Sequence, residues 1–210
     1  MAVTNSRQMA QAISQVFDVP QVSAEVVSRT LMEHGLRASG GRGRGATAMK
    51  GRDIFNVAIT VASGVGMRDA PGFVKSVEEM RLVGGDMFAD ELQQWEAPSV
   101  RRDGTFHFLM HLVDKPLEDM KVTPTFGPFI SAWIDGLFAD VFAWREAGDL
   151  ELRLSHVGPT AEFVFKDQDR DLRLHYAAHG QFTEKKPDWE RVTIIRGDVF
   201  RKFAEILSGV

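Results

Sequence analysis

A glycine-rich segment at residues 37–49 constrains the fold of this chain more than any other feature. Glycines stand at positions 40, 41, 43 and 45, with Arg42 and Arg44 between them. Such a stretch offers almost no side chains to a core, and glycine lacks the restriction that favours a regular helix. We therefore expect a surface loop or a loose hairpin here, which separates the elements before it from those after it.

Two helices are predicted before this loop. Apolar residues recur at helical spacing over residues 6–17 and again over residues 23–34. Pro20 ends the first helix because it cannot continue the hydrogen-bond ladder. Ser6 and Ser23 are the expected N-caps, since a serine hydroxyl can accept a hydrogen bond from the first backbone N–H groups.

The second helix carries a stop signal, and a third helix follows the loop. Gly35 can take the left-handed conformation that ends a helix, and Leu36 can then fold back onto the last turn. Residues 50–63 are apolar nearly all round, which predicts a buried helix. Residues 1–66 are thus expected to form a small three-helix head.

Residues 67–210 predict an α+β body. The helical periodicity of residues 71–146 gives way to alternation of apolar and polar residues over about residues 149–195. Short strands joined by tight turns indicate a small antiparallel sheet, and a closing helix is expected at residues 198–207. In the helical middle, the separate helices are expected at residues 71–83, 88–95 and 129–146.

The charge is divided unevenly between these parts. Residues 1–75 contain nine Lys and Arg against five Asp and Glu, whereas the remainder contains sixteen against twenty-four. The whole chain has a formal net charge of −4. A basic head on an acidic body indicates a protein that uses one end on an anionic partner.

The composition excludes several classes of site and location. The chain has no cysteine, which excludes disulfides, thiolate nucleophiles and cysteine-bound zinc. The N-terminus lacks a basic stretch followed by an apolar run, and the most apolar stretch, residues 129–143, is broken by Asp135 and Asp140. We therefore expect a cytoplasmic protein with no secretory signal and no membrane partner.

The order helix, short turn, helix, Gly/Arg loop, helix has a physical meaning. A helix-turn-helix presents its second helix to the major groove of double-stranded DNA, where base edges differ in their donors and acceptors. A following loop can reach phosphates, which arginine binds with two parallel hydrogen bonds. The candidate DNA contacts are the basic residues of the second helix, the loop and the start of the third helix: Arg29, Arg37, Arg42, Arg44, Lys50 and Arg52.

This part of the chain resembles a known family. The second helix, the Gly35-Leu36 stop, the loop and the third helix are similar to the winged-helix heads of MerR-type and excisionase-type DNA-binding proteins. The GGRGRG run also resembles the N-termini of phage-related bacterial proteins. The resemblance implies a winged-helix-like head in which Arg29 faces the groove and Arg42 and Arg44 act as wing contacts.

Two functional hypotheses follow. The first is a DNA-binding protein of bacterial or phage origin, either a transcriptional regulator or a recognition subunit for phage DNA packaging. So few basic residues would bind weakly, so we expect a homo-oligomer that raises the effective concentration of the second head. The alternative is a protein-interaction or structural component with a solvated Gly/Arg loop, because Glu25 and Glu33 on the second helix would repel phosphate.

No motif in the sequence indicates an enzyme. A nucleotide-binding Walker loop needs a Lys followed by Ser or Thr after a strand, but Lys50 is followed by Gly51 and a helix precedes the loop. His107 and His111 have the spacing of a zinc-protease pair, but Phe108 stands where the glutamate base would be. We therefore expect a non-enzymatic protein without a cofactor or a metal.

Overall fold

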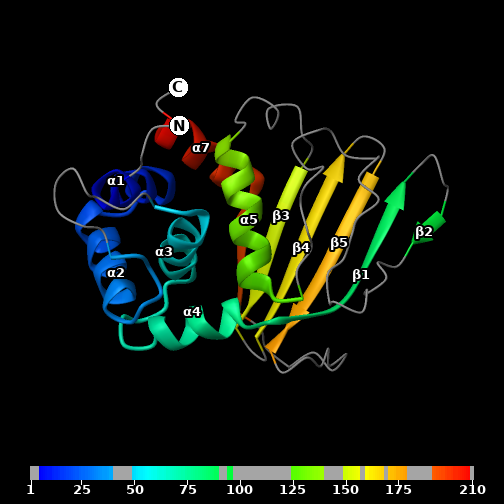
Figure 1. Cartoon of the computed structure of the whole chain (residues 1–210), viewed down its shortest axis with the longest axis horizontal. Helices are drawn as coiled ribbons and strands as arrows, with labels where there is room; N and C mark the ends of the chain where they lie inside the picture. The colour runs from blue at the N-terminus through cyan, green and yellow to red at the C-terminus, as the bar shows by residue number, and fades with distance from the viewer. Residues whose placement is uncertain are drawn as a thin grey trace. The chain divides into compact units, whose positions relative to one another are not determined.

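The computed structural model describes residues 5–39, 49–89, 94–96, 124–139, 149–156, 159–167, 170–178 and 191–208. Within these ranges the chain is an α+β protein, as predicted, with helices at its N-terminus and an antiparallel sheet nearer its C-terminus (Figure 1). None of its described helices is long and apolar enough to cross a membrane.

The chain divides into two compact units that do not follow the expected single boundary after residue 66. The first unit comprises Met1–Lys75, Ile130–Val141 and Val199–Val210, and the second comprises Ser76–Phe129 and Phe142–Asp198. The N-terminal helices therefore share their unit with two segments from far along the chain, which no local sequence pattern could indicate.

The three predicted N-terminal helices are confirmed as α1 (Ser6–Phe17), α2 (Gln21–Glu33) and α3 (Gly51–Ser63). Figure 1 shows the chain turning sharply between α1 and α2, with α3 beside α2. The predicted caps of the first two helices are wrong. Asn5 caps α1 by accepting hydrogen bonds from the backbone N–H groups of the second and third helical residues, and α2 begins after Pro20, two residues before Ser23.

The end of α2 and the burial of α3 follow the sequence prediction. Gly35 has a φ of +70°, and the Leu36 N–H donates to the carbonyl of Leu31 at 2.9 Å, so Leu36 folds back and is buried. In α3, all eight residues from 53 to 60 are buried. Of the three N-terminal helices, α3 has the most buried residues.

Two later helices contribute aromatic side chains to the first unit. The helices are α5 (Phe126–Ala139) and α7 (Gly197–Ser208), whose unit-one parts begin at residues 130 and 199. The Trp133 ring meets the Phe200 ring edge-to-face with centroids 5.3 Å apart, and Phe17 of α1 meets Phe203 at 5.8 Å. Apolar burial of these rings stabilises the unit beyond its three N-terminal helices.

The second unit is built on a six-stranded antiparallel sheet with the strand order β2-β1-β5-β4-β3-β6. The predicted meander is confirmed, because β3, β4 and β5 are neighbours in sequence and in the sheet. The strands are β1 (Arg81–Ala89), β2 (Gln94–Glu96), β3 (Asp149–Ser155), β4 (Thr160–Asp167), β5 (Arg170–Ala177) and β6 (Val192–Arg196).

The prediction for the helical middle is only partly correct. Helix α4 (Ala70–Glu78) confirms the helix expected at 71–83 up to residue 78, but residues 81–83 already belong to β1. The helix expected at 88–95 is wrong where the structure describes it, because residues 88 and 89 belong to β1 and residues 94 and 95 to β2. Strand β1 pairs with β5, so that Gly85 lies opposite Leu174. Pairing with β5 favours a strand here, and because β5 is distant in sequence, local periodicity could not predict it. Helix α5 confirms the helix expected at 129–146 over residues 129–139, although it begins three residues earlier, at Phe126; residues 140–148 lie outside the described ranges.

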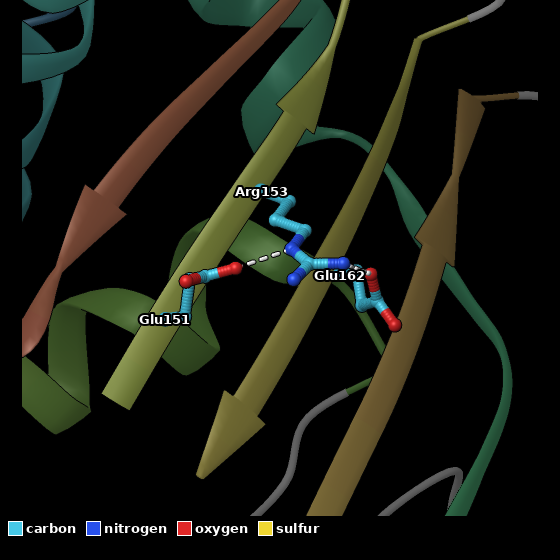
Figure 2. A network of polar contacts seen from close by, with 3 residues as sticks. All are labelled: Glu151, Arg153 and Glu162. Atoms are coloured by element: carbon cyan, nitrogen blue, oxygen red, sulfur yellow. Dashed lines mark hydrogen bonds and ion pairs between the residues drawn. The ribbon is translucent and has the colours of Figure 1, made fainter. Parts of the chain in front are cut away.

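In the central strands β3 to β5, one face of the sheet is apolar and the other carries charged side chains. Phe126 and Phe129 of α5 pack on Tyr176 and Phe163, with ring centroids 5.1 and 5.0 Å apart. On the opposite face, Figure 2 shows Arg153 of β3 between two glutamates: its Nε donates to Glu151, and its Nη1 lies 3.6 Å from Glu162. The hydrogen bond and charge of Glu151 raise the pKa of Arg153. Because the Arg153 side chain is half-exposed, these three residues form an ordinary surface ion network.

Candidate nucleic-acid interface

Helix α2 buries one stripe and exposes the opposite one. Its buried stripe consists of Ala24, Val27, Ser28 and Leu31. A helix has 3.6 residues per turn, so the opposite stripe contains Val22, Val26, Arg29 and Glu33, all exposed, with Val22 at 68% and Val26 at 42%. Arg29 therefore lies where a groove-facing residue would have to lie, next to two apolar side chains and one acid.

One carboxylate holds both ends of the Gly/Arg segment. The Ala38 N–H donates to Asp53 Oδ1 at 2.7 Å, and the Lys50 N–H donates to Asp53 Oδ2 at 2.9 Å. Asp53 stands in the first turn of α3 and is 3% exposed. A buried carboxylate at a helix N-terminus is favoured by the helix dipole, and charge-assisted hydrogen bonds are stronger than neutral ones. One side chain therefore fixes both residues that flank the Gly/Arg segment, Ala38 before it and Lys50 after it.

Arg37 does not belong to the interface, contrary to the sequence prediction. Its side chain is 6% exposed, and it donates from Nε to the carbonyl of Ser28 at 3.0 Å and from Nη1 to the carbonyl of Ala38 at 2.9 Å. Burial lowers the pKa of the guanidinium, and the nearby Asp53 carboxylate raises it. A side chain buried to this extent is not accessible to a phosphate, and its hydrogen bonds instead hold the residues next to the Gly/Arg segment.

The other predicted contacts divide between described and undescribed residues. Lys50 and Arg52 are exposed at the start of α3, on either side of Gly51. Arg42 and Arg44 lie outside the described residues. In the described part of residues 5–75, exposed basic side chains outnumber exposed acidic ones by six to four. The basic set is Arg7, Arg29, Lys50, Arg52, Arg68 and Lys75, and the acidic set is Asp18, Glu25, Glu33 and Asp69.

A second carboxylate supports the start of α3. Asp135 of α5 accepts a hydrogen bond from the Gly51 N–H at 2.6 Å. Burial raises the pKa of Asp135, against the hydrogen bond from Gly51 and the charge of Lys50, which lower it. An added Cβ at Gly51 would lie 2.6 Å from the carbonyl oxygen of Ser131, so α3 and α5 approach closely at this point.

Neither carboxylate was predicted to have this role from the sequence. Asp53 follows Lys50 by three residues, the spacing at which an acidic side chain bonds back to the start of its helix, and this pattern could have identified it. Asp135 is 84 residues away from Gly51, and no local pattern connects the two.

The described residues contain no group of three or more His, Cys, Asp or Glu side chains that could hold a metal ion. The histidine pair at 107 and 111 lies outside these residues. No protein-family model, curated protein or solved structure matches the chain. The resemblance to MerR-type and excisionase-type heads therefore depends on the sequence motif alone.

Proposed function

We propose that this protein binds double-stranded DNA through its first unit, without enzymatic activity. The observation that carries the proposal is that Asp53 holds both ends of a segment that contains Arg42 and Arg44, next to a helix with one exposed stripe. A loop whose ends are fixed loses less conformational freedom on binding than a free tail would.

The proposed contacts come from three elements of a winged-helix-like head. Arg29 of α2 enters the major groove, while Arg42 and Arg44 of the loop and Lys50 and Arg52 at the start of α3 meet phosphates. The positive surplus among the exposed side chains of this part supports an anionic partner.

One head offers few phosphate contacts, so the proposal includes a homo-oligomer that places two or more heads on one duplex. Transcriptional regulation and recognition of phage DNA for packaging are the two roles that the sequence motif favours. Both require duplex binding, so that property is tested first.

The direct test measures binding of a fluorescent random-sequence duplex at low salt. We expect the double variant R42A/R44A to bind at least tenfold more weakly than the wild type, because it removes two charge-assisted contacts to phosphate. The control R7A/R68A removes the same charge from two exposed positions that are not among the proposed contacts. It is expected to bind within about threefold of the wild type, because it weakens only the long-range electrostatic attraction to DNA and removes no proposed contact.

The protein-interaction hypothesis keeps one specific observation in its favour. Glu25 and Glu33 are exposed on the same helix as Arg29, together with two exposed valines. If the wild type binds no duplex at low salt, DNA binding is wrong and this alternative is favoured.

A further inference from the structure

Two exposed valines stand at the N-terminal end of the exposed α2 stripe. Val22 is 68% exposed and Val26 is 42% exposed, one turn further along. The remaining large exposed apolar residues described in the first unit, Met67 and Ile206, stand singly. An exposed Leu or Val is common, but a pair on one stripe beside a basic residue is a surface with a defined chemistry.

The surroundings of the pair indicate the charge of its partner. The next residue along the stripe is the exposed Arg29, and exposed basic side chains outnumber acidic ones in this part of the unit. Glu25 beside the stripe has one carboxylate oxygen hydrogen-bonded to Gln21 Nε2 at 2.8 Å. The stripe therefore has two apolar side chains at its N-terminal end, positive charge next to them at Arg29, and one acid, Glu33, at its far end. The described part of residues 5–75 around it has a positive surplus among its exposed side chains.

Duplex DNA presents an apolar group at a base edge in the major groove: the C5-methyl of thymine. We propose that Val22 and Val26 contact thymine methyl groups and give this protein a preference for duplexes with thymine along the contacted groove. This inference rests on the proposed DNA-binding function and assigns the bases that α2 recognises.

The spacing of the two side chains fits this role. Residues four apart on a helix are separated by about 6 Å along its axis, and stacked base pairs are separated by about 3.4 Å. The two valines can thus meet methyl groups about two base-pair steps apart. The N-terminal half of a recognition helix is the part that contacts base edges, and both valines lie in that half of α2.

The test compares an alternating dA·dT duplex with an alternating dA·dU duplex of the same length, which lacks only the thymine methyl groups. Thymine occurs throughout the first duplex, so the test does not require the natural site. We expect the wild type to bind the dA·dU duplex more weakly, by about fourfold for each methyl group that becomes buried. The V22A/V26A variant is expected to bind both duplexes equally, with the affinity that the wild type has for dA·dU.

The variants should fold, because alanine is a better helix former than valine at exposed positions. The control I206A removes an exposed apolar side chain from α7 and should keep the wild-type preference for thymine. Equal binding of both duplexes by the wild type, or an unchanged thymine preference in V22A/V26A, would overturn the inference and leave DNA binding intact. The absence of binding to either duplex would overturn both proposals. A change in self-association in V22A/V26A with an unchanged thymine preference would assign the surface to a second copy of the chain instead.

Discussion

At the scale of single residues, Asp53 is the side chain on which the proposed interface depends most. It is buried and accepts hydrogen bonds from the N–H groups of Ala38 and Lys50, one at each end of the Gly/Arg segment. Each of its two carboxylate oxygens has one of these donors. An amide at the same position has only one acceptor oxygen, and its NH2 group would face a backbone donor.

The variant D53N should therefore lower the free energy of unfolding by about 1–3 kcal/mol, because one buried backbone N–H group loses its acceptor. Urea denaturation measures this directly. The matched control D18N changes an exposed aspartate in the left-handed region, where asparagine is also tolerated, and should leave stability nearly unchanged. Equal stability of D53N and the wild type would mean that Asp53 does not hold the residues that flank the Gly/Arg segment.

Asp135 gives the first unit a pH dependence of defined sign. Burial raises the folded-state pKa of this carboxyl above its value in the unfolded chain. The folded state thus holds the proton more tightly, so the stabilisation linked to this group is present below the unfolded pKa and is lost as pH rises through the folded pKa.

The variant D135N retains an oxygen that can accept from the Gly51 N–H and has no charge to bury. We expect it to be more stable than the wild type at pH 7. The difference should shrink as the pH is lowered to 4, because the raised pKa lets Asp135 take up its proton more readily than an ordinary aspartate does. Urea denaturation at the two pH values tests the sign. A larger advantage for D135N at the lower pH would contradict this account of Asp135.

Arg37 shows what a single residue in a sequence cannot reveal. Its position beside four glycines predicted a solvated phosphate contact, yet its guanidinium is used on the carbonyls of Ser28 and Ala38. Residue type and local composition are the same for a buried arginine and an exposed one. Arg37 is buried because of how α2 and α3 pack, and this packing cannot be read from the residues next to Arg37.

At the scale of elements, the start of α3 depends on the absence of a side chain at Gly51. A Cβ there would lie 2.6 Å from the Ser131 carbonyl oxygen, a backbone atom that cannot rotate away. We expect G51A to lower the free energy of unfolding by about 1–3 kcal/mol, the usual cost of overpacking. Thermal denaturation measures the change.

The matched control is G72A in α4, where an added Cβ would have no heavy atom within 4 Å. Alanine should stabilise this exposed helical position by up to about 1 kcal/mol. A destabilised G72A, or a G51A variant as stable as the wild type, would be inconsistent with the close approach of α3 and α5.

The elements that the sequence predicted correctly are those with strong local signals. Periodicity and the Gly35 stop identify α1, α2 and α3, and period-two alternation identifies β3, β4 and β5. Strand β1 was missed because its two central glycines interrupt any pattern and its principal partner, β5, follows about ninety residues later. Pairing at that distance has no local signature.

At the scale of the whole molecule, the α+β class could be predicted, but the division of the chain could not. Segments at residues 130–141 and 199–210 belong to the same unit as the N-terminal helices. Their contribution comes from aromatic packing, such as Trp133 on Phe200, between positions far apart in sequence. A boundary drawn from glycines and prolines near residue 66 cannot contain this information.

The central claim is that the arginines of the Gly/Arg segment, whose flanking residues Asp53 fixes, bind DNA phosphates. The most direct test is the slope of log binding constant against log salt concentration for a random-sequence duplex, compared between the wild type and R42A/R44A. Each lost phosphate contact should reduce the steepness of the slope by about 0.9, so the double variant should have a slope shallower by up to about 2. Identical slopes for the two proteins would contradict the claim.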